Sequence, residues 1–284
     1  MLDVRAPTSL ELRQAVLAVS VLADVDLEPA EDGVVLPGSP PVRVPWGECL
    51  RALAGHDPAG AAGRARLTDW LRARRWCADA GPQALATALR PVGLPLDHVL
   101  HPGLDWVRER VLGDALDLGI GAVGLDPADP ERVVLVPTTA LDTAGIDPER
   151  AWSPARERLE AMGALAAQRT QRDSKGLLRP YGDCDVVTLL GARSLRAALA
   201  QAAGGMAGAV VPMRRRGWTR LSLIDPAFGP AAAAATEPAE RGFDRPLLVT
   251  AEEVTVVGNG GRPQVIVLRD PAADPPWRRD VLYR

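Results

Sequence analysis

The segment 172–185 holds the densest mixture of acidic, basic and nucleophilic side chains in the sequence. Asp183 and Asp185 could act as an acid and a base if both faced one cleft, since neighbouring carboxyl groups separate each other's pKa values. Lys175 and Arg179 could hold an anionic substrate beside them. The segment is also consistent with a solvated loop in which Asp185 caps the helix that follows.

His98 and His101 are the closest pair among the three histidines. Residues three apart share one face of a helix, so these imidazoles could bind a metal ion or supply a general base. Pro102 and Gly103 end any helix directly after them, and no cysteine or further histidine reinforces the pair. We therefore expect no metal site. One alternative is an enzyme acting on an anionic small molecule, with His98 or His101 as the general base.

Arg214, Arg215 and Arg216 are adjacent and are followed closely by Trp218. Guanidinium groups bind phosphates and an indole stacks on bases, so this motif indicates nucleic-acid binding as a further alternative. The whole chain has a formal net charge of -3 and a pI near 5.7, which argues against a nucleic-acid binder. Arginine stacked on tryptophan at the surface would explain the motif without any ligand.

Motifs for common cofactors are incomplete. Gly119, Gly121 and Gly124 have the spacing of the dinucleotide-binding fingerprint, but a proline-rich segment follows them where a helix is required. We predict a glycine-rich strand there instead. The phosphate-binding loop of nucleotide hydrolases and the serine motif of α/β-hydrolases are both missing. We therefore expect no cofactor and a binding or interaction module without catalysis, whose partner is a protein or a small anionic ligand.

The composition is that of a globular protein, with 284 residues of which 47% are hydrophobic and 24% charged. This length fits a single domain over 1–284, with a possible subdivision near 126–130. Lys175 is the only lysine among 33 basic residues, a bias typical of high-GC bacteria such as actinobacteria. Three widely spaced cysteines and a first segment unlike a signal peptide predict a cytoplasmic protein, and no apolar run is long enough to cross a membrane.

Hydrophobic periodicity predicts helices and short strands that do not alternate regularly, which favours an α+β fold over the alternative of a mixed α/β sheet. The predicted helices cover 9–24, 61–76, 83–89, 106–118, 153–169, 186–202 and 231–235. The predicted strands form hairpins within 34–44 and 119–136, a strand at 209–212 and a three-stranded meander within 247–268.

A Val-Pro pair at the end of a strand is followed three times by an Asp-Pro pair, about ten residues further along. This pattern predicts that the proline ends a strand and that the aspartate caps the next helix or turn. The three instances are Val44-Pro45 with Asp57-Pro58, Val136-Pro137 with Asp147-Pro148, and Val211-Pro212 with Asp225-Pro226.

Overall fold

The computed structural model describes residues 9–99, 101–102, 105–112, 115–173, 175–220 and 227–257. These residues form eight α-helices and three small antiparallel sheets, so the fold is α+β, as predicted. None of the helices in this part of the chain is long and apolar enough to span a membrane. The chain forms two compact units. Unit 1 is Met1–Leu89, Pro102–Val107 and Ile120–Ala151, and unit 2 is Arg90–His101, Arg108–Gly119 and Trp152–Arg284.

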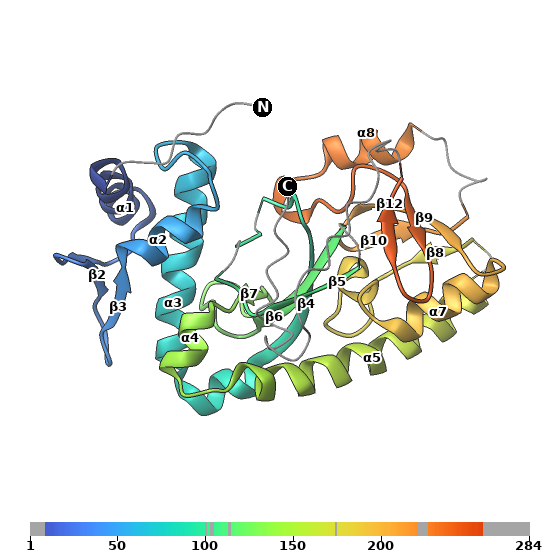
Figure 1. Ribbon diagram of the computed structural model, residues 1–284, viewed down its shortest axis with the longest axis horizontal. Coiled ribbons are helices and arrows are strands. Elements are labelled where there is room, and N and C mark those ends of the chain that lie inside the picture. The colour runs from blue at the N-terminus through green and yellow to red at the C-terminus, as the bar shows by residue number, and fades with distance from the viewer. Residues whose placement is uncertain are drawn as a thin grey trace, which may run out of the picture. The chain divides into compact units, whose positions relative to one another are not determined.

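Unit 1 begins with a helix that packs on two further helices and lies near a three-stranded sheet (Figure 1). The strands have the order β1-β2-β3, and Val34 pairs with Val44, which confirms the first predicted hairpin. The elements of this region are α1 (Ser9–Ala23), β1 (Glu28–Pro29), β2 (Gly33–Leu36), β3 (Val42–Pro45), α2 (Trp46–Leu53) and α3 (Ala61–Ala88).

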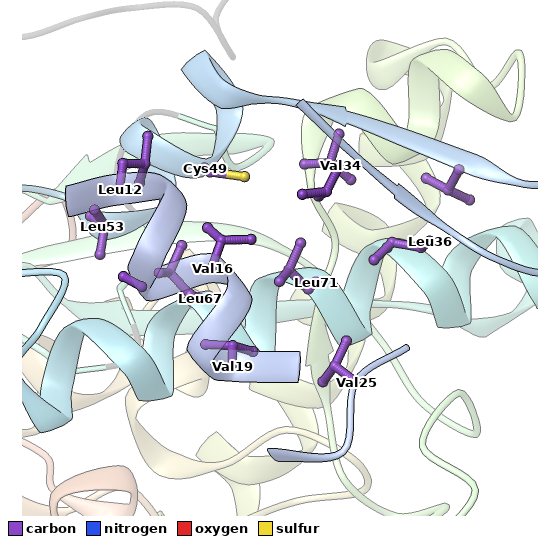
Figure 2. Close-up of a cluster of buried hydrophobic side chains, with 13 residues drawn as sticks. Leu12, Val16, Val19, Val25, Val34, Leu36, Cys49, Leu53, Leu67 and Leu71 are labelled. Atoms are coloured by element: carbon purple, nitrogen blue, oxygen red, sulfur yellow. The ribbon is translucent and has the colours of Figure 1, made fainter. Parts of the chain in front are cut away.

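The core of this region lies between α1 and α3 (Figure 2). Leu12, Val16 and Val19 recur at helical spacing on one face of α1 and are at most 4% exposed. They pack with Leu67 and Leu71 of α3, both fully buried. Each buried leucine or valine contributes about 1.5–3 kcal/mol, so this cluster is the main reason why α1 is held in place.

Helix α3 joins two of the predicted helices. It contains one residue with non-helical backbone angles, Gly81, at φ 72° and ψ 168°. Glycine is suited to this left-handed region because it has no Cβ, and Pro82 follows as the first residue of the second stretch. The prediction of two helices at 61–76 and 83–89 was therefore correct in substance, although the first stretch is longer than expected.

Glu48 is a buried acid that connects three helices of unit 1. Its Oε1 lies 2.8 Å from Nε of Arg74, and both side chains are at most 5% exposed. The indole of Trp70 and the hydroxyl of Thr139 also donate hydrogen bonds to Oε1, at 3.0 and 2.9 Å. The network joins α2, α3 and α4 (Thr138–Thr143). A buried carboxylate with this many partners is a structural element and not a candidate acid or base.

The segment from Trp106 to Leu118 was predicted to be a helix, and this prediction is wrong. It forms β5 (Arg108–Leu112) and the start of β6 (Leu116–Ala122). All seven residues of β6 are buried, and a buried strand shows no alternation that would distinguish it from a helix. The third sheet has the order β4-β6-β5 with β7 (Val134–Leu135) pairing β6, where β4 is Leu89–Pro95.

Strand β6 includes the first two glycines of the dinucleotide-like spacing. Gly121 pairs with Leu135 and Ala122 with Val134, which confirms the second predicted hairpin. The next residues are bends and turns up to β7, so no helix follows the strand. The predicted glycine-rich strand is therefore present, in a context that does not suit a dinucleotide.

Helix α5 spans Pro148–Arg172. We predicted that it would begin at Ser153-Pro154, and this was wrong by one and a half turns. Asp147 precedes the first turn instead, and its Oδ1 accepts a hydrogen bond from the backbone N–H of Glu149 at 3.1 Å. Pro154 is the seventh residue of the helix, and because proline has no N–H it leaves the carbonyl oxygen of Arg150 without its usual i+4 donor.

Unit 2 contains a five-stranded sheet with the order β12-β11-β9-β10-β8. Helix α8 (Phe228–Ala235) packs on β9, and α7 (Arg193–Ala202) packs on β9 and β11 from the other side of the sheet (Figure 1). The strands are β8 (Leu177–Leu178), β9 (Ala207–Met213), β10 (Arg216–Trp218), β11 (Leu247–Val249) and β12 (Val254–Val256), and a 3-10 turn, η2, covers Pro238–Glu240. The predicted third strand of the meander, 265–268, lies outside the described residues.

The helix predicted at 186–202 is divided into α6 (Val186–Leu189) and α7. Arg196 is 5% exposed and donates through Nη1 to the carbonyl oxygens of Leu190 and Gly191, at 2.9 and 2.6 Å. These bonds satisfy carbonyl groups that the end of α6 leaves without helical partners. A buried arginine therefore stabilises an interruption that apolar periodicity alone does not reveal.

Candidate anion-binding site

Both histidines of the predicted pair are buried in unit 2. His101 is 9% exposed, and its Nε2 lies 2.9 Å from Oδ2 of Asp117, which is fully buried on β6. Arg108 of β5 forms an ion pair with the same carboxylate oxygen. The Asp117 carboxylate is therefore shared between an imidazole and a guanidinium group, an arrangement that stabilises a buried charge.

His98 lies close enough to Arg214 and Asp185 for both charges to act on its pKa. Burial, followed by the positive charge of Arg214, lowers the pKa of His98 to about 4, against smaller opposing effects of a hydrogen bond to the backbone of Ala239 and of Asp185. The imidazole is neutral at pH 7. A general base works best with a pKa near the working pH, so His98 is poorly suited to that role.

The carboxylates of Asp183 and Asp185 face different arginines. Oδ2 of Asp183 lies 2.7 Å from Nε of Arg90 and 2.9 Å from Nη2 of Arg158. Oδ2 of Asp185 lies 2.6 Å from Nη2 of Arg214, while its Oδ1 accepts a hydrogen bond at 2.7 Å from the N–H of Thr188 and so caps α6. The predicted cap is confirmed. Two carboxylates held by separate guanidinium groups are not arranged to share a proton.

Arg214 has a structural role that its two neighbours lack. It lies in the turn between β9 and β10, and besides the ion pair with Asp185 its carbonyl oxygen accepts a hydrogen bond from the N–H of Val186 at 2.8 Å. Its own N–H donates to the carbonyl oxygen of Glu240 at 2.9 Å. Arg215 and Arg216, by contrast, are exposed. The three arginines that the sequence groups together therefore separate into one structural and two surface residues.

Strands β8 and β10 bring the remaining predicted cations together. Gly217 pairs with Leu178 and Trp218 with Leu177 in antiparallel register. Arg179 and Arg216 adjoin the first of these pairs along the chain. In the other direction, the N–H of Thr219 donates to the carbonyl oxygen of Gly176 at 2.8 Å, so the pairing extends beyond both strands.

Side chains alternate between the two faces of these strands. Gly217 and Leu178 are buried, so they mark the inner face. The outer side of the two strands carries Leu177, Arg216 and Trp218, and the exposed cations Lys175, Arg179 and Arg220 flank the strands; these six residues are named here the basic face. Arg179 and Arg216 adjoin the pair Leu178–Gly217, and Lys175 and Arg220 follow beyond the pair Leu177–Trp218, where Gly176 has a φ of 65°.

The cations of the basic face form no ion pair with any other residue that the structure describes. Asp173 is the nearest acid in the sequence before β8, and its Oδ1 accepts a hydrogen bond from the N–H of Lys175 at 2.8 Å.

Trp218 is held in a defined orientation between the cations. Its ring packs edge to face with that of Phe228 in α8, with centroids 5.0 Å apart and planes at 87°. The contact leaves the indole half-buried on the outer face. Aromatic pairs of this kind are worth about 0.5–1.5 kcal/mol beyond their buried area, so the indole has little freedom to turn.

The sequence identified Lys175, Arg179, Arg215 and Arg216 as candidate anion-binding residues, and the structure places them on or beside the basic face. Arg220, an exposed arginine two residues beyond β10, was not among the candidates. Of the candidates named for catalysis, His98 lies near Asp185, while Asp183 is held by other arginines.

Charge is unevenly divided between the two units. Unit 1 contains 18 acidic and 11 basic residues, a charge of -7, and unit 2 contains 18 acidic and 22 basic residues, a charge of +4, which together give the -3 of the whole chain. The acidic pI therefore describes unit 1 better than the unit that contains the basic face. A whole-chain pI is a weak argument against anion binding when the charges are separated in this way.

Among the described residues, no group of three or more histidine, cysteine, aspartate and glutamate side chains is arranged to hold a metal ion. Comparison with family models, with curated proteins and with solved structures gave no match in any of the three searches.

Proposed function

We propose that the protein is a binding module, without catalysis of its own, that recognises an anionic partner through the basic face. The observation that carries this proposal is the position of Arg179 and Arg216, which adjoin the paired residues Leu178 and Gly217, are exposed and form no ion pair with the described residues. Two guanidinium groups placed beside one pair of strand residues can converge on one phosphate or carboxylate group.

The alternative of an enzyme acting on an anionic small molecule has less support. Asp183, Asp185 and Asp117 are each held in ion pairs, and Asp185 also caps a helix. The Cys184 thiol is also unsuited to act as a nucleophile, because burial and the neighbouring Asp183 and Asp185 raise its pKa to about 12. These groups are occupied in maintaining the fold.

We further propose that the protein acts in the cytoplasm of a high-GC bacterium. The strong preference for arginine over lysine supports the origin, and three free, buried cysteines in the described chain suit a reducing compartment.

The test is calorimetric titration of the full chain with inorganic polyphosphate at 50 and 200 mM salt. We expect binding that weakens steeply with salt, and at least a tenfold loss of affinity in the double variant R179S/R216S. The matched control is R43S/R193S, which removes the same charge from exposed arginines that are paired with Asp32 and Glu252. The control should stay within twofold of the unmodified protein.

Two results would contradict the proposal. If both double variants lose affinity equally, the binding depends on overall charge and not on the basic face. If the unmodified protein binds no polyanion at low salt, the basic face has no anionic partner of this kind. A thermal unfolding curve for each variant shows whether a loss reflects misfolding.

A further inference from the structure

The basic face combines two kinds of contact in an order that suits one class of anion. Arg216 and Trp218 lie on the same face of β10, and Leu177 of β8 pairs with Trp218. The exposed cations Lys175, Arg179 and Arg220 lie one or two residues beyond the ends of the two strands. The result is an aromatic ring with cations around it. Phosphate groups need the cations, and a base needs the ring.

We infer, on the basis of the function proposed above, that the basic face binds single-stranded nucleic acid, with a base stacked on Trp218 and phosphates on the flanking cations. Single strands are favoured over duplexes because the bases of a duplex are stacked on each other and their faces are not accessible to an indole. An acidic peptide could satisfy the cations, but it would have no ring to place on Trp218. The experiment therefore has to distinguish binding of an acidic peptide from binding of a nucleic acid.

The experiment measures binding of the full chain to a labelled twelve-residue oligothymidylate by fluorescence anisotropy. The competitors are an abasic strand of the same length, the corresponding duplex and poly-glutamate. We expect the oligothymidylate to bind at least tenfold more tightly than the abasic strand, because stacking of one base contributes about that much. The duplex and poly-glutamate should be weaker still.

The variants separate stacking from charge. W218L should lose about tenfold in affinity for oligothymidylate and leave affinity for the abasic strand within twofold, whereas W218F, which keeps a ring, should retain most of the binding. W46L is the control, since Trp46 is a half-buried tryptophan on α2 in unit 1. R179S/R216S should reduce the slope of log affinity against log salt by about 1.4, because each phosphate contact on a single strand contributes about 0.7.

The outcomes distinguish this inference from the proposed function. If the abasic strand or poly-glutamate binds as tightly as oligothymidylate, and R179S/R216S weakens all of them, the face binds anions without stacking and the nucleic-acid inference is wrong. If none of the polyanions depends on Arg179 and Arg216, both proposals fail. Should W218L not fold, the comparison of oligothymidylate with the abasic strand on unmodified protein still decides.

Discussion

At the scale of single residues, His98 shows how burial changes a chemical property that the sequence suggests. Its side chain is 6% exposed, and burial followed by the charge of Arg214 lowers its pKa to about 4. The unfolded chain takes up a proton at this residue near pH 6.5, while the native protein resists protonation until about pH 4. The free energy of unfolding therefore decreases as the pH falls from 6.5 to 4, by about 3 kcal/mol across that window.

The variant H98Q, which cannot be protonated, should lose less stability between pH 7 and pH 4 than the unmodified protein, as measured by urea unfolding at several pH values. H56Q is the control, because His56 is exposed and its pKa is lowered mainly by limited burial. NMR titration should show that the imidazole of His98 becomes protonated only near pH 4. Equal pH dependence of H98Q and the unmodified protein would contradict the prediction.

The residue types of the candidate site could be chosen from the sequence, but their roles could not. Arg214, Arg215 and Arg216 are identical in type and adjacent in position. They differ because Asp185, 29 residues away, forms an ion pair with Arg214 alone. Likewise, nothing local to Leu178, the residue before Arg179, indicates that it pairs with Gly217. Both facts depend on strand register and long-range pairing, which a periodic pattern does not encode.

At the scale of elements, the proline and aspartate pairs between elements predicted where strands end and helices or turns begin better than apolar periodicity did. The Val-Pro and Asp-Pro pattern correctly predicted two strand ends and two starts. After β3, Pro45 precedes α2, and Asp57 begins the turn before α3. After β7, Pro137 precedes α4, and Asp147 precedes α5. In the third instance β9 continues through Pro212 to Met213, and 225–226 lie outside the described residues.

The start of α5 gives a test at this scale. D147A removes the carboxylate that accepts a hydrogen bond from the N–H of Glu149, and it should lower the free energy of unfolding by about 1 kcal/mol. S153A is the matched control, because Ser153 lies inside the helix and its serine cap was wrongly predicted. Alanine should be neutral or slightly favourable there. A larger loss for S153A than for D147A in urea unfolding would restore the original prediction.

Buried strands were the elements that sequence patterns could not identify. Strand β6 is buried along its whole length, and the apolar residues that surround its charged Asp117 were read as one face of a helix. Asp117 is compatible with this position only because His101 and Arg108 reach it from other elements. A polar residue in a buried strand can be predicted only when its partners are known, and these lie 9 and 16 residues away.

At the scale of the whole molecule, the chain passes between the two units five times. Three of these passages occur inside regular elements, since β4, β6 and α5 each contribute residues to both units. Independent domains are usually joined by linkers that few contacts cross. Strands and a helix that each belong to both units cannot remain intact when only one unit unfolds. We therefore expect a single cooperative unfolding transition, in line with the prediction of one domain.

The three cysteines can report this transition from both units. Cys49 and Cys77 lie in unit 1 and Cys184 lies in unit 2. Burial raises the pKa of each thiol to about 12. At pH 8 only about one thiol in ten thousand is therefore a reactive thiolate. Labelling in urea, on variants that retain only Cys49 or only Cys184, should give the same free energy of unfolding, because a thiol reacts only after its surroundings open. If Cys184 becomes reactive at a clearly lower urea concentration than Cys49, unit 2 opens alone. A circular dichroism unfolding curve with two steps would support that result. Coincident curves would mean that the acidic unit and the unit with the basic face are stable only together.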